Sequence, residues 1–267
     1  MKRIIAILLA ALMLLSMVAC GGEDPTTTTT TKKTTTTTTR RTEDPGNTIE
    51  PEPGDDPEKY DANVYLAYGS PVVDGVKEDC WSKAMPFTLE TIMKDAPEAT
   101  VTAYQMWDTS RLYFFFEIED VDVAQDSTEG DWHNDGIYLY ISELCTFGVS
   151  SYDSYLDYEG LYQFAIINET LTQLPRYGAA DFTEDDYTCN INITENGITI
   201  EFSYAPKYLK LEAGQQICLD YQYNDCTTEG VRIGCLSWWR SKDGDTDPVN
   251  MAIGELLAEG AEMPTIE

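Results

Sequence analysis

The sequence has little of the chemistry on which most enzymes depend. Its only histidine is His133, which excludes a histidine-based triad and a metal site built from several imidazoles. It contains no G-x-S-x-G segment, no P-loop and no glycine fingerprint of a dinucleotide-binding domain. Carboxylate pairs are numerous, but in a chain this acidic their number does not indicate a glycosidase. We therefore expect a protein that is not an enzyme.

Basic residues are scarce as well. The chain has 17 lysines and arginines against 47 aspartates and glutamates, which gives a formal net charge of −30 at pH 7. A surface of this charge repels nucleic acid and anionic membranes. It is compatible with neutral sugars, cations or basic partners, so we expect no nucleic-acid partner.

Long apolar runs are lacking except at the N-terminus, where Ile4 to Met17 follow Lys2 and Arg3. That run is short for a membrane-spanning helix and is typical of a secretory signal, which we assign to residues 1–20. The residues around Cys20 resemble a bacterial lipobox. We expect lipidation of Cys20, so that the N-terminal lipid alone anchors the protein at the extracellular face of the plasma membrane. The alternative is an ordinary signal peptide with a chance cysteine.

Residues 21–60 have almost no large apolar side chains. Threonine runs over 26–31 and 34–39 are followed by a tract rich in proline, glycine and acidic residues. Such a segment cannot offset the entropy of ordering, so we predict a disordered tether. One domain is expected over residues 61–258, with a short tail over 259–267.

No C-x-x-C spacing is present, so neither a zinc ribbon nor a redox motif is indicated. An even number of cysteines in an exported protein favours disulfides, but buried free thiols are an equal alternative, and the sequence does not choose a pairing. Apart from Cys20 these residues are Cys80, Cys145, Cys189, Cys218, Cys226 and Cys235.

What the folded part does contain is a series of short alternating strands separated by turn residues. Within the strand 112–118, Leu112, Phe114, Phe116 and Ile118 are predicted to face one way, with Tyr113, Phe115 and Glu117 on the other side. Asn196-Gly197 predicts a hairpin. Further strands are expected at 64–68, 100–107, 136–141, 161–168, 187–194, 198–203, 216–223, 232–239 and 251–257, and short helices at 77–84 and 206–211. This pattern favours an all-β fold, a single antiparallel β-sandwich.

The order of motifs resembles carbohydrate-binding module family 9, the β-sandwich modules often appended to xylanases. The resemblance covers nearly all of residues 62–258. Its motifs are Tyr68-Gly69-Ser70-Pro71-Val72-Val73-Asp74-Gly75, Trp81, Trp107-Asp108, Leu112-Tyr113, Asp120, Trp132-x-x-Asp135, Gln163-Phe164, Asn224-Asp225, Gly230-x-Arg232, Ser237-Trp238 and Gly254-Glu255-Leu256.

The resemblance implies a site that clamps a terminal sugar between two tryptophans. Trp132 stands at the first position, where an exposed indole would stack on the apolar face of a pyranose. The second position falls near Asp245, which is not aromatic, and Trp239 is the nearest substitute. The family's sugar-contacting arginine and glutamate are Ala165 and Tyr138 here, whereas its other arginine is kept as Arg232. The candidate sugar-binding residues are Trp132, Arg232, Trp239 and Tyr138, with Tyr140 and Arg240 as weaker candidates; Trp81, Trp107 and Trp238 are expected in the core.

Carboxylates crowd the loop between the strands 112–118 and 136–141. A hard cation such as Ca²⁺ takes several oxygen ligands at once and would order this loop, and the resemblance also implies structural calcium. The alternative is a solvated acidic loop, since no EF-hand pattern is present. Asp120 and Asp135 are the strongest candidates, and the predicted ligand set is Asp120, Asp122, Asp126 and Asp135.

The sequence thus predicts a monomeric, lipid-anchored module that binds neutral polysaccharide or oligosaccharide and supports polysaccharide capture or degradation. Two alternatives come from other classes of protein. Related sandwiches bind haem for electron transfer, and Met106, Met251 and His133 could supply axial ligands. A sandwich that only scaffolds a protein partner would bind neither sugar nor haem.

Overall fold

The computed structural model describes residues 60–94, 97–124, 130, 133–145, 159–167, 173–177, 182–239 and 251–265. The chain divides into two units, residues 1–55 and 56–267, and all the described residues belong to the second. No helix in this part of the chain is long and apolar enough to cross a membrane.

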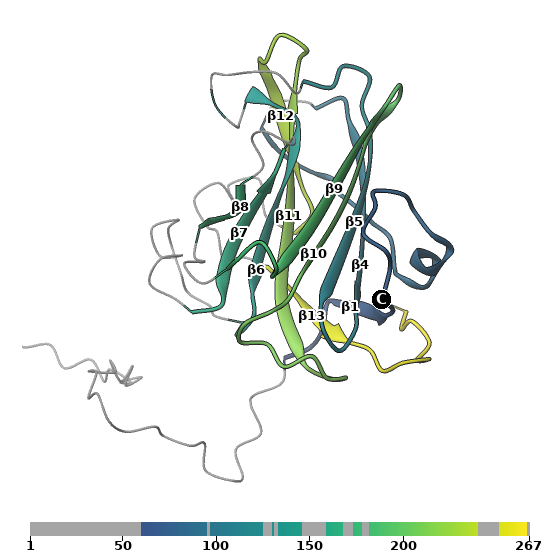
Figure 1. The fold of residues 1–267 in the computed structure, drawn as a ribbon. Helices are drawn as coiled ribbons and strands as arrows, with labels where there is room; N and C mark the ends of the chain where they lie inside the picture. The colour runs from purple at the N-terminus through teal and green to yellow at the C-terminus, as the bar shows by residue number, and fades with distance from the viewer. Residues whose placement is uncertain are drawn as a thin grey trace, which may run out of the picture. The chain divides into compact units, whose positions relative to one another are not determined.

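Short β-strands dominate the described residues, and the one helix is a 3-10 turn, η1 (Asp79–Lys83) (Figure 1). The strands are β1 (Val64–Tyr68), β2 (Phe87–Thr88), β3 (Thr91–Lys94), β4 (Thr100–Trp107), β5 (Leu112–Glu119), β6 (Gly136–Ser142), β7 (Leu161–Ile166), β8 (Gln173–Tyr177), β9 (Tyr187–Thr194), β10 (Gly197–Tyr204), β11 (Gln216–Cys226), β12 (Arg232–Ser237) and β13 (Ala252–Leu256).

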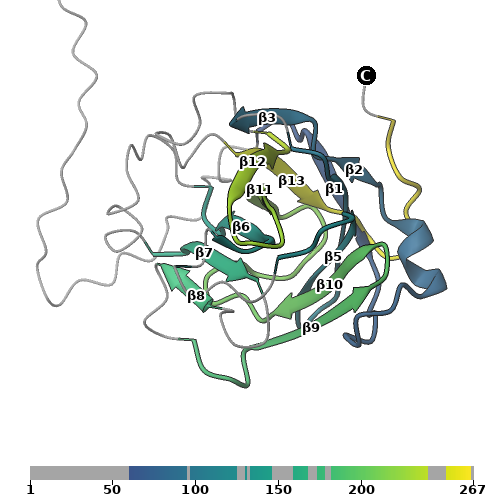
Figure 2. The same ribbon diagram turned by 90° about the horizontal axis from the view of Figure 1, so that it is seen from above.

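The strands follow the order β8-β7-β6-β11-β13-β1-β4-β5-β10-β9, with β12, β3 and β2 attached at the side. β1 joins two sheets because its first half pairs with β13 and its second half with β4, in both cases parallel. Sheet A comprises β8, β7, β6, β11, β12, β3 and β13, and sheet B comprises β2, β4, β5, β10 and β9. Figure 2 shows the two layers facing each other around a common interior. The predicted all-β sandwich is confirmed.

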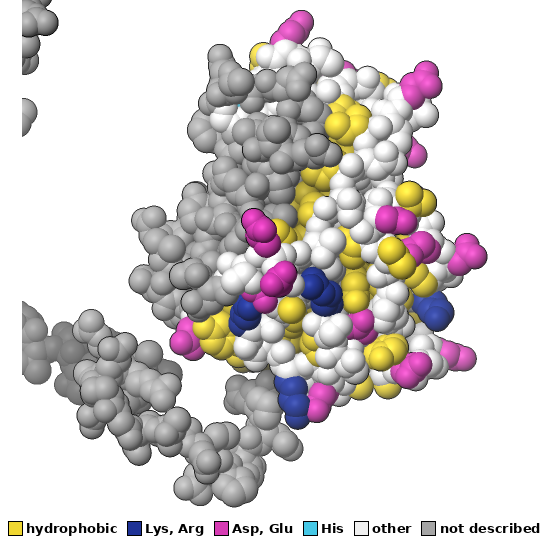
Figure 3. All heavy atoms as spheres, in the orientation of Figure 1, with side chains coloured by type: hydrophobic (Ala, Val, Ile, Leu, Met, Phe, Trp, Pro, Cys, Tyr) yellow, Lys and Arg dark blue, Asp and Glu magenta, His cyan; other side chains and the backbone are white. Residues whose placement is uncertain are grey.

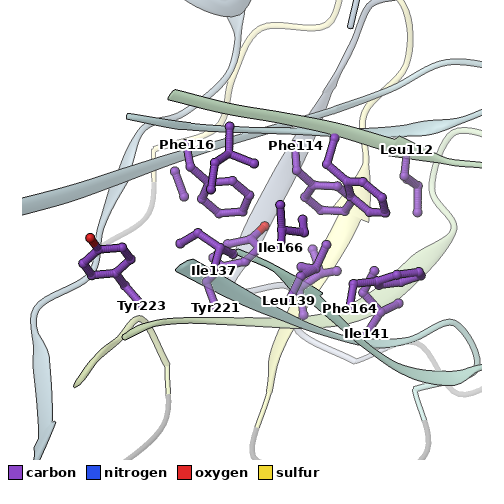
Figure 4. Close-up of a cluster of buried hydrophobic side chains, with 14 of the residues drawn as sticks. Leu112, Phe114, Phe116, Ile137, Leu139, Ile141, Phe164, Ile166, Tyr221 and Tyr223 are labelled. Carbon is purple, nitrogen blue, oxygen red and sulfur yellow. The ribbon is translucent and has the colours of Figure 1, made fainter. Parts of the chain in front are cut away.

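The interior follows from the predicted alternation of β5. Leu112, Phe114 and Phe116 project from this strand into the core and meet side chains of sheet A (Figure 4). Phe116 lies edge-on to Tyr221 of β11, with ring centroids 5.3 Å apart. Burying aromatic area of this kind supplies much of the favourable free energy of folding. The facing residues of sheet A are Ile137, Leu139, Ile141, Phe164, Ile166, Tyr221 and Tyr223.

The outer face of sheet B is covered by the segment that contains η1. Trp81 is fully buried there and packs against Phe115, which explains why the second face of β5 is also apolar. Glu201 of β10 fixes this segment, because its carboxylate accepts the indole N–H of Trp81 at 3.1 Å and the backbone N–H groups of Asp74 and Gly75 at 2.9 Å. The motif from Asp74-Gly75 to Trp81 therefore has a structural role, as expected for Trp81.

Two sequence predictions were wrong in detail. Residues 206–211 do not form a helix; the carboxylate of Glu143 accepts the backbone N–H groups of residues 207–209 instead, at 3.0, 2.6 and 3.0 Å. The short strands β2, β3 and β8 were not predicted; β3 is held by pairing with the distant strand β12, and β2 and β8 pair with β4 and β7. No disulfide joins the six cysteines of the described residues in this structure.

The surface shares the acidic composition of the chain. Figure 3 shows acidic side chains spread over one face of the molecule, and the few basic ones lie in its lower half. On this face the acidic side chains are therefore dispersed and do not form one patch.

Asp108 organises the turn between β4 and β5. Its carboxylate accepts hydrogen bonds from the Ser110 and Arg111 backbone and from the Ser70 and Tyr113 hydroxyls, at 2.7 to 2.9 Å. Burial alone would raise the pKa of Asp108, but the hydrogen bonds from Ser110, Ser70 and Tyr113 outweigh it and hold the pKa at about 2.

We predict that Asp108 makes folding stability fall in strong acid. Because its folded-state pKa is lowered, its contribution is complete above about pH 4 and is lost as the pH falls towards 2, by about 2 kcal/mol. Asp108→Asn should destabilise the protein at pH 7 and flatten this part of the pH profile. Urea unfolding between pH 2 and 7 measures both effects, and exposed Asp185→Asn is the control. An unchanged acid slope in Asp108→Asn would contradict the assignment.

Candidate functional site

The outer face of sheet A carries a group of polar side chains although it is buried. On β11, Tyr221 points into the core, while Asp220, Gln222 and Asn224 point outward with exposed fractions of 0, 5 and 1%. Strand register brings polar side chains of three neighbouring strands beside them. We call the following set the polar face: Tyr138, Tyr140, Gln163, Asp220, Gln222, Asn224, Arg232 and Ser237.

A chain of hydrogen bonds runs across the polar face. The hydroxyl of Tyr140 donates to Gln222 Oε1 at 3.3 Å, and Gln222 Nε2 donates to Asn224 Oδ1 at 3.1 Å. Arg232 Nη2 donates to the same Asn224 oxygen at 2.9 Å. These contacts fix the amide of Gln222 and the guanidinium of Arg232, so that the face is ordered before a ligand arrives.

Among the amide and guanidinium groups of the polar face, two atoms remain unsatisfied. Gln163 Oε1 and Arg232 Nε are buried and have no hydrogen-bond partner in the described part of the chain. A buried polar atom without a partner costs free energy, and native proteins leave few of them. A hydroxylated ligand could supply both an acceptor for Arg232 and a donor for Gln163.

An aromatic ring lies at the border of this face. Trp239 follows β12, is 39% exposed, and donates its backbone N–H to Asp220 Oδ1 at 2.9 Å. Its neighbour Trp238 turns inward and stacks on Tyr221 with ring centroids 5.2 Å apart, which confirms the predicted core role of Trp238. Trp107 is likewise buried, as predicted.

The structure brings three of the four predicted sugar-binding residues, Tyr138, Arg232 and Trp239, to this face. Trp132, like Arg240 and Asp126, lies outside the described residues. The residue after Trp132 is described: His133 Nδ1 lies 2.7 Å from the carbonyl oxygen of Gly230, two residues before Arg232. This contact joins the loop before β6 to the start of β12.

The sequence prediction did not include the amides of the polar face. Gln163 and Asn224 were recognised as motif positions without a role, and Gln222 was not singled out. The sequence of β11 contained a signal for these amides, because aromatic residues alternate with Asp220, Gln222 and Asn224 over the whole central part of the strand. A strand with one polar row and one aromatic row indicates two different environments.

Two of the departures from the family pattern lie at one place. Tyr138 on β6 and Ala165 on β7 are direct cross-strand partners, and both are buried. The resemblance puts a glutamate and an arginine at these positions. A charged pair is therefore replaced here by a large aromatic residue opposite a small apolar one.

A cluster of carboxylates lies at one end of the strands. Oxygen atoms of Asp120, Asp135 and Asp225 all lie within 4.8 Å of one another, and the three residues are buried with exposed fractions of 6, 0 and 1%. Asp120 follows β5, Asp135 precedes β6, and Asp225 lies in β11 next to Asn224. The carboxylate cluster therefore borders the polar face.

Hydrogen bonds fix each carboxylate in place. Asp135 Oδ1 accepts the backbone N–H of Cys226 at 2.7 Å, and its Oδ2 accepts that of Ala124. Tyr223 donates its hydroxyl to Asp120 at 2.7 Å. Asp225 Oδ2 accepts the N–H groups of residues 98 and 99 at 2.7 and 3.1 Å, whereas its Oδ1 is buried without a hydrogen-bond partner in the described part of the chain.

The cluster is electrostatically unfavourable without a cation. Burial, together with the charges of Asp120 and Asp225, raises the pKa of Asp135 to about 8 in spite of the backbone N–H groups that it accepts. Burial likewise raises the pKa of Asp225. Three buried carboxylates with an unsatisfied oxygen are a donor set that suits a hard divalent ion.

The predicted ligand set agrees with this cluster only in part. Asp120 and Asp135 are brought together as predicted. Asp122 is half-buried and is not among the three clustered carboxylates. It contributes only its backbone N–H, which donates to Asp120 Oδ1 at 3.1 Å. Asp225 was missed because it is distant in sequence and comes from another strand.

The haem alternative is not supported by the positions of its methionines. Met106 packs with Trp81 and Phe115 on the outer face of sheet B. Met251 packs with Tyr138 and Tyr140 on the outer face of sheet A. The two side chains lie on opposite outer faces, so they cannot be axial ligands of one haem.

Comparison with known protein families shows to which family this chain belongs. A family model described as carbohydrate family 9 binding domain-like matches residues 73–257. The chain belongs to this family.

The curated relatives of this family 9 domain are large enzymes. Exoglucanase XynX of Acetivibrio thermocellus is 26% identical over 193 residues, which is 72% of this chain and 17% of that enzyme. Endo-1,4-beta-xylanase A of Thermoanaerobacterium saccharolyticum is 23% identical over 193 residues, 72% of this chain and 16% of that enzyme. The chain thus spans about a sixth of the length of these relatives.

Solved structures share the fold. A family 9 carbohydrate-binding module from Caldicellulosiruptor kristjanssonii in complex with cellotriose has a TM-score of 0.61 and 16% identity, and covers 76% of this chain and 98% of its own. The same kind of module in complex with glucose also has a TM-score of 0.61. The predicted family 9 β-sandwich is confirmed.

Proposed function

We propose that this family 9 domain binds neutral oligosaccharide or polysaccharide on the polar face and performs no catalysis. The observation that carries the proposal is the hydrogen-bonded row of Gln222, Asn224 and Arg232. Beside it, Gln163 Oε1 and Arg232 Nε are buried without a hydrogen-bond partner in the described residues and could bind a ligand. Relatives of the same fold are described in complex with cellotriose and glucose, which supports a β-glucan or similar sugar as the ligand.

The chemistry of the face suits a neutral sugar. A pyranose offers an apolar C–H face to an aromatic ring and hydroxyl groups to amides and a guanidinium. Trp132 is the proposed stacking platform, with Trp239 at the border as a second ring. Asp220 Oδ1 accepts the Trp239 and Tyr221 backbone N–H groups, which fixes the position of this carboxylate on the face.

We predict that Trp132→Ala and Gln222→Leu each weaken cellotriose binding at least tenfold, a loss of about 1.4 kcal/mol. The first change removes the stacking ring, and the second removes the central amide while keeping the side-chain volume. Isothermal titration calorimetry measures the affinity. Tyr104→Ala is the control, because it removes a half-buried ring from the outer face of sheet B. Unchanged affinity in both test variants would disprove the proposed site.

The same experiment has a gain-of-binding arm. The double variant Tyr138→Glu, Ala165→Arg places the charged pair implied by the family resemblance at facing positions. We expect it to bind glucose and cellotriose more tightly than the parent chain. Each single variant buries one charge without its partner and should instead lose stability.

We further propose that the carboxylate cluster binds Ca²⁺ through Asp120, Asp135 and Asp225. The cation would neutralise three buried carboxylates and occupy the unsatisfied Asp225 oxygen. Because Asp225 adjoins Asn224, the ion would also hold the end of β11 that carries the polar face.

We predict that Ca²⁺ raises the melting temperature by about 5 °C and that EDTA reverses the effect. Asp225→Asn keeps an acceptor for the two backbone N–H groups but removes a ligand charge, so it should abolish the calcium-dependent shift while the protein still folds. Differential scanning calorimetry measures the shift, and Asp185→Asn is the control. If the Tm of the parent chain changes with neither Ca²⁺ nor EDTA, the site is ruled out.

The location of the protein is a separate proposal. We propose that Cys20 is lipidated and that residues 21–60 tether the monomeric domain at the extracellular face of the plasma membrane, where it supports polysaccharide capture or degradation. The enzymes among its relatives are consistent with that setting.

We predict that Cys20→Ala releases the protein from the membrane fraction into the medium or periplasm. Mass spectrometry of the purified N-terminus should find a diacylglyceryl group on Cys20 of the parent chain. An unmodified Cys20, or an equal distribution of both forms, would contradict the anchor.

A further inference from the structure

Two cysteines distant in sequence are brought together at one end of the outer face of sheet A. Cys218 lies on β11 and pairs with Ser142, the last residue of β6. After Ser142 the chain turns back, and the backbone N–H of Cys145 donates to the carbonyl oxygen of Ser142 at 3.3 Å. The turn therefore carries Cys145 back towards the strand partner of Ser142, which is Cys218.

The packing of the two side chains agrees with this path. Cys218 belongs to the apolar cluster on the outer face of sheet A, and Cys145 packs against that cluster. A hydrogen bond between the two thiols, together with burial, raises the pKa of Cys218 well above its usual range. Two thiols within hydrogen-bonding reach are close enough for a disulfide after a small adjustment of the turn.

The other cysteines have different surroundings. Cys80 packs on the outer face of sheet B, and Cys189 packs against the interior. On the opposite end of the polar face, Cys235 Sγ contacts Asn224 and Arg232. Cys226 pairs with Arg232 in the strand register and lies close enough to Cys235 for the two thiols to interact electrostatically. The hydrogen bond between their thiols and their shared apolar cluster make Cys145 and Cys218 a pair that is placed to cross-link.

We infer that Cys145 and Cys218 form an intramolecular disulfide when the folded protein meets a disulfide oxidant such as oxidised glutathione. Cys145 is half-buried and Cys218 only 2% exposed, so Cys145 reacts first. Its thiolate attacks the oxidant, forms a mixed disulfide and releases one glutathione. Cys218 then attacks the Cys145 sulfur and releases the second glutathione. Two protein thiols are oxidised, one glutathione disulfide is reduced, and the two thiol protons leave with the glutathione molecules.

The cross-link would act on the stability of the sandwich. It closes a loop of roughly 70 residues and so reduces the entropy of the unfolded chain. It also fixes the turn beside Glu143, whose carboxylate holds the backbone of residues 207–209. The inference does not depend on the proposed sugar or calcium binding.

The experiment uses the full chain with Cys20→Ser, so that Cys20 cannot form intermolecular disulfides. The folded protein is treated with oxidised glutathione or with a phosphine reductant, alkylated and digested without reduction. Asp-N cleaves before Asp220 and Asp225, which separates Cys218 from Cys226, and trypsin cleaves after Lys207 and Lys210, which separates Cys218 from Cys189. We expect a linked Cys145–Cys218 peptide pair in the oxidised sample and a Tm about 5 to 10 °C higher than in the reduced sample.

Serine variants identify the pair. Cys145→Ser and Cys218→Ser should each lose the oxidant-dependent Tm shift, while Cys189→Ser keeps it. Their reduced-state Tm values show whether the variants fold, and the peptide map of the parent chain remains decisive if one does not. A different linked pair, or no intramolecular cross-link in the folded chain under conditions that oxidise the same chain in guanidinium, would overturn the inference.

Discussion

The alternation of side chains along β11 is the constraint on which both the core and the candidate sites depend. Tyr221 and Tyr223 project from one side into the interior, and Gln222 and Asn224 project from the other side into the polar face. A slip of one residue in register would exchange the two rows and bury the amides in the core. The aromatic packing of Tyr221 against Phe116 and Trp238 therefore also fixes where the polar face lies.

The carboxylate cluster is linked to the same strand from both sides. Tyr223 reaches from the core to Asp120, and Asp135 accepts the backbone N–H of Cys226 at the end of β11. Asp225 adds a third carboxylate from within the strand. Any change in the charge of the cluster must therefore act on the strand end that presents Asn224. This gives a direct physical route by which cation binding and sugar binding would be coupled.

Local patterns in the sequence predicted what depends on local contacts. The two faces of β5 followed from the alternation of Leu112 to Ile118, and the crowding of one loop identified Asp120 and Asp135. Asp225 could not be found in this way, because β11 meets β6 only in the folded sheet, where Asn224 pairs with Gly136. The helix predicted over residues 206–211 was wrong for a similar reason. The acceptor of N–H groups in this segment is Glu143, which comes from a turn distant in sequence.

The facing positions Tyr138 and Ala165 show why family membership does not transfer a ligand specificity. The resemblance assigns a glutamate and an arginine to these positions, and strand pairing makes them neighbours. Losing only one of the two would leave a buried charge without its partner, which is strongly destabilising. In this chain a large ring lies opposite a small side chain, and neither position carries a charge. The fold is thereby kept, while two of the family's charged contacts are removed at once from the face that is proposed to meet the sugar.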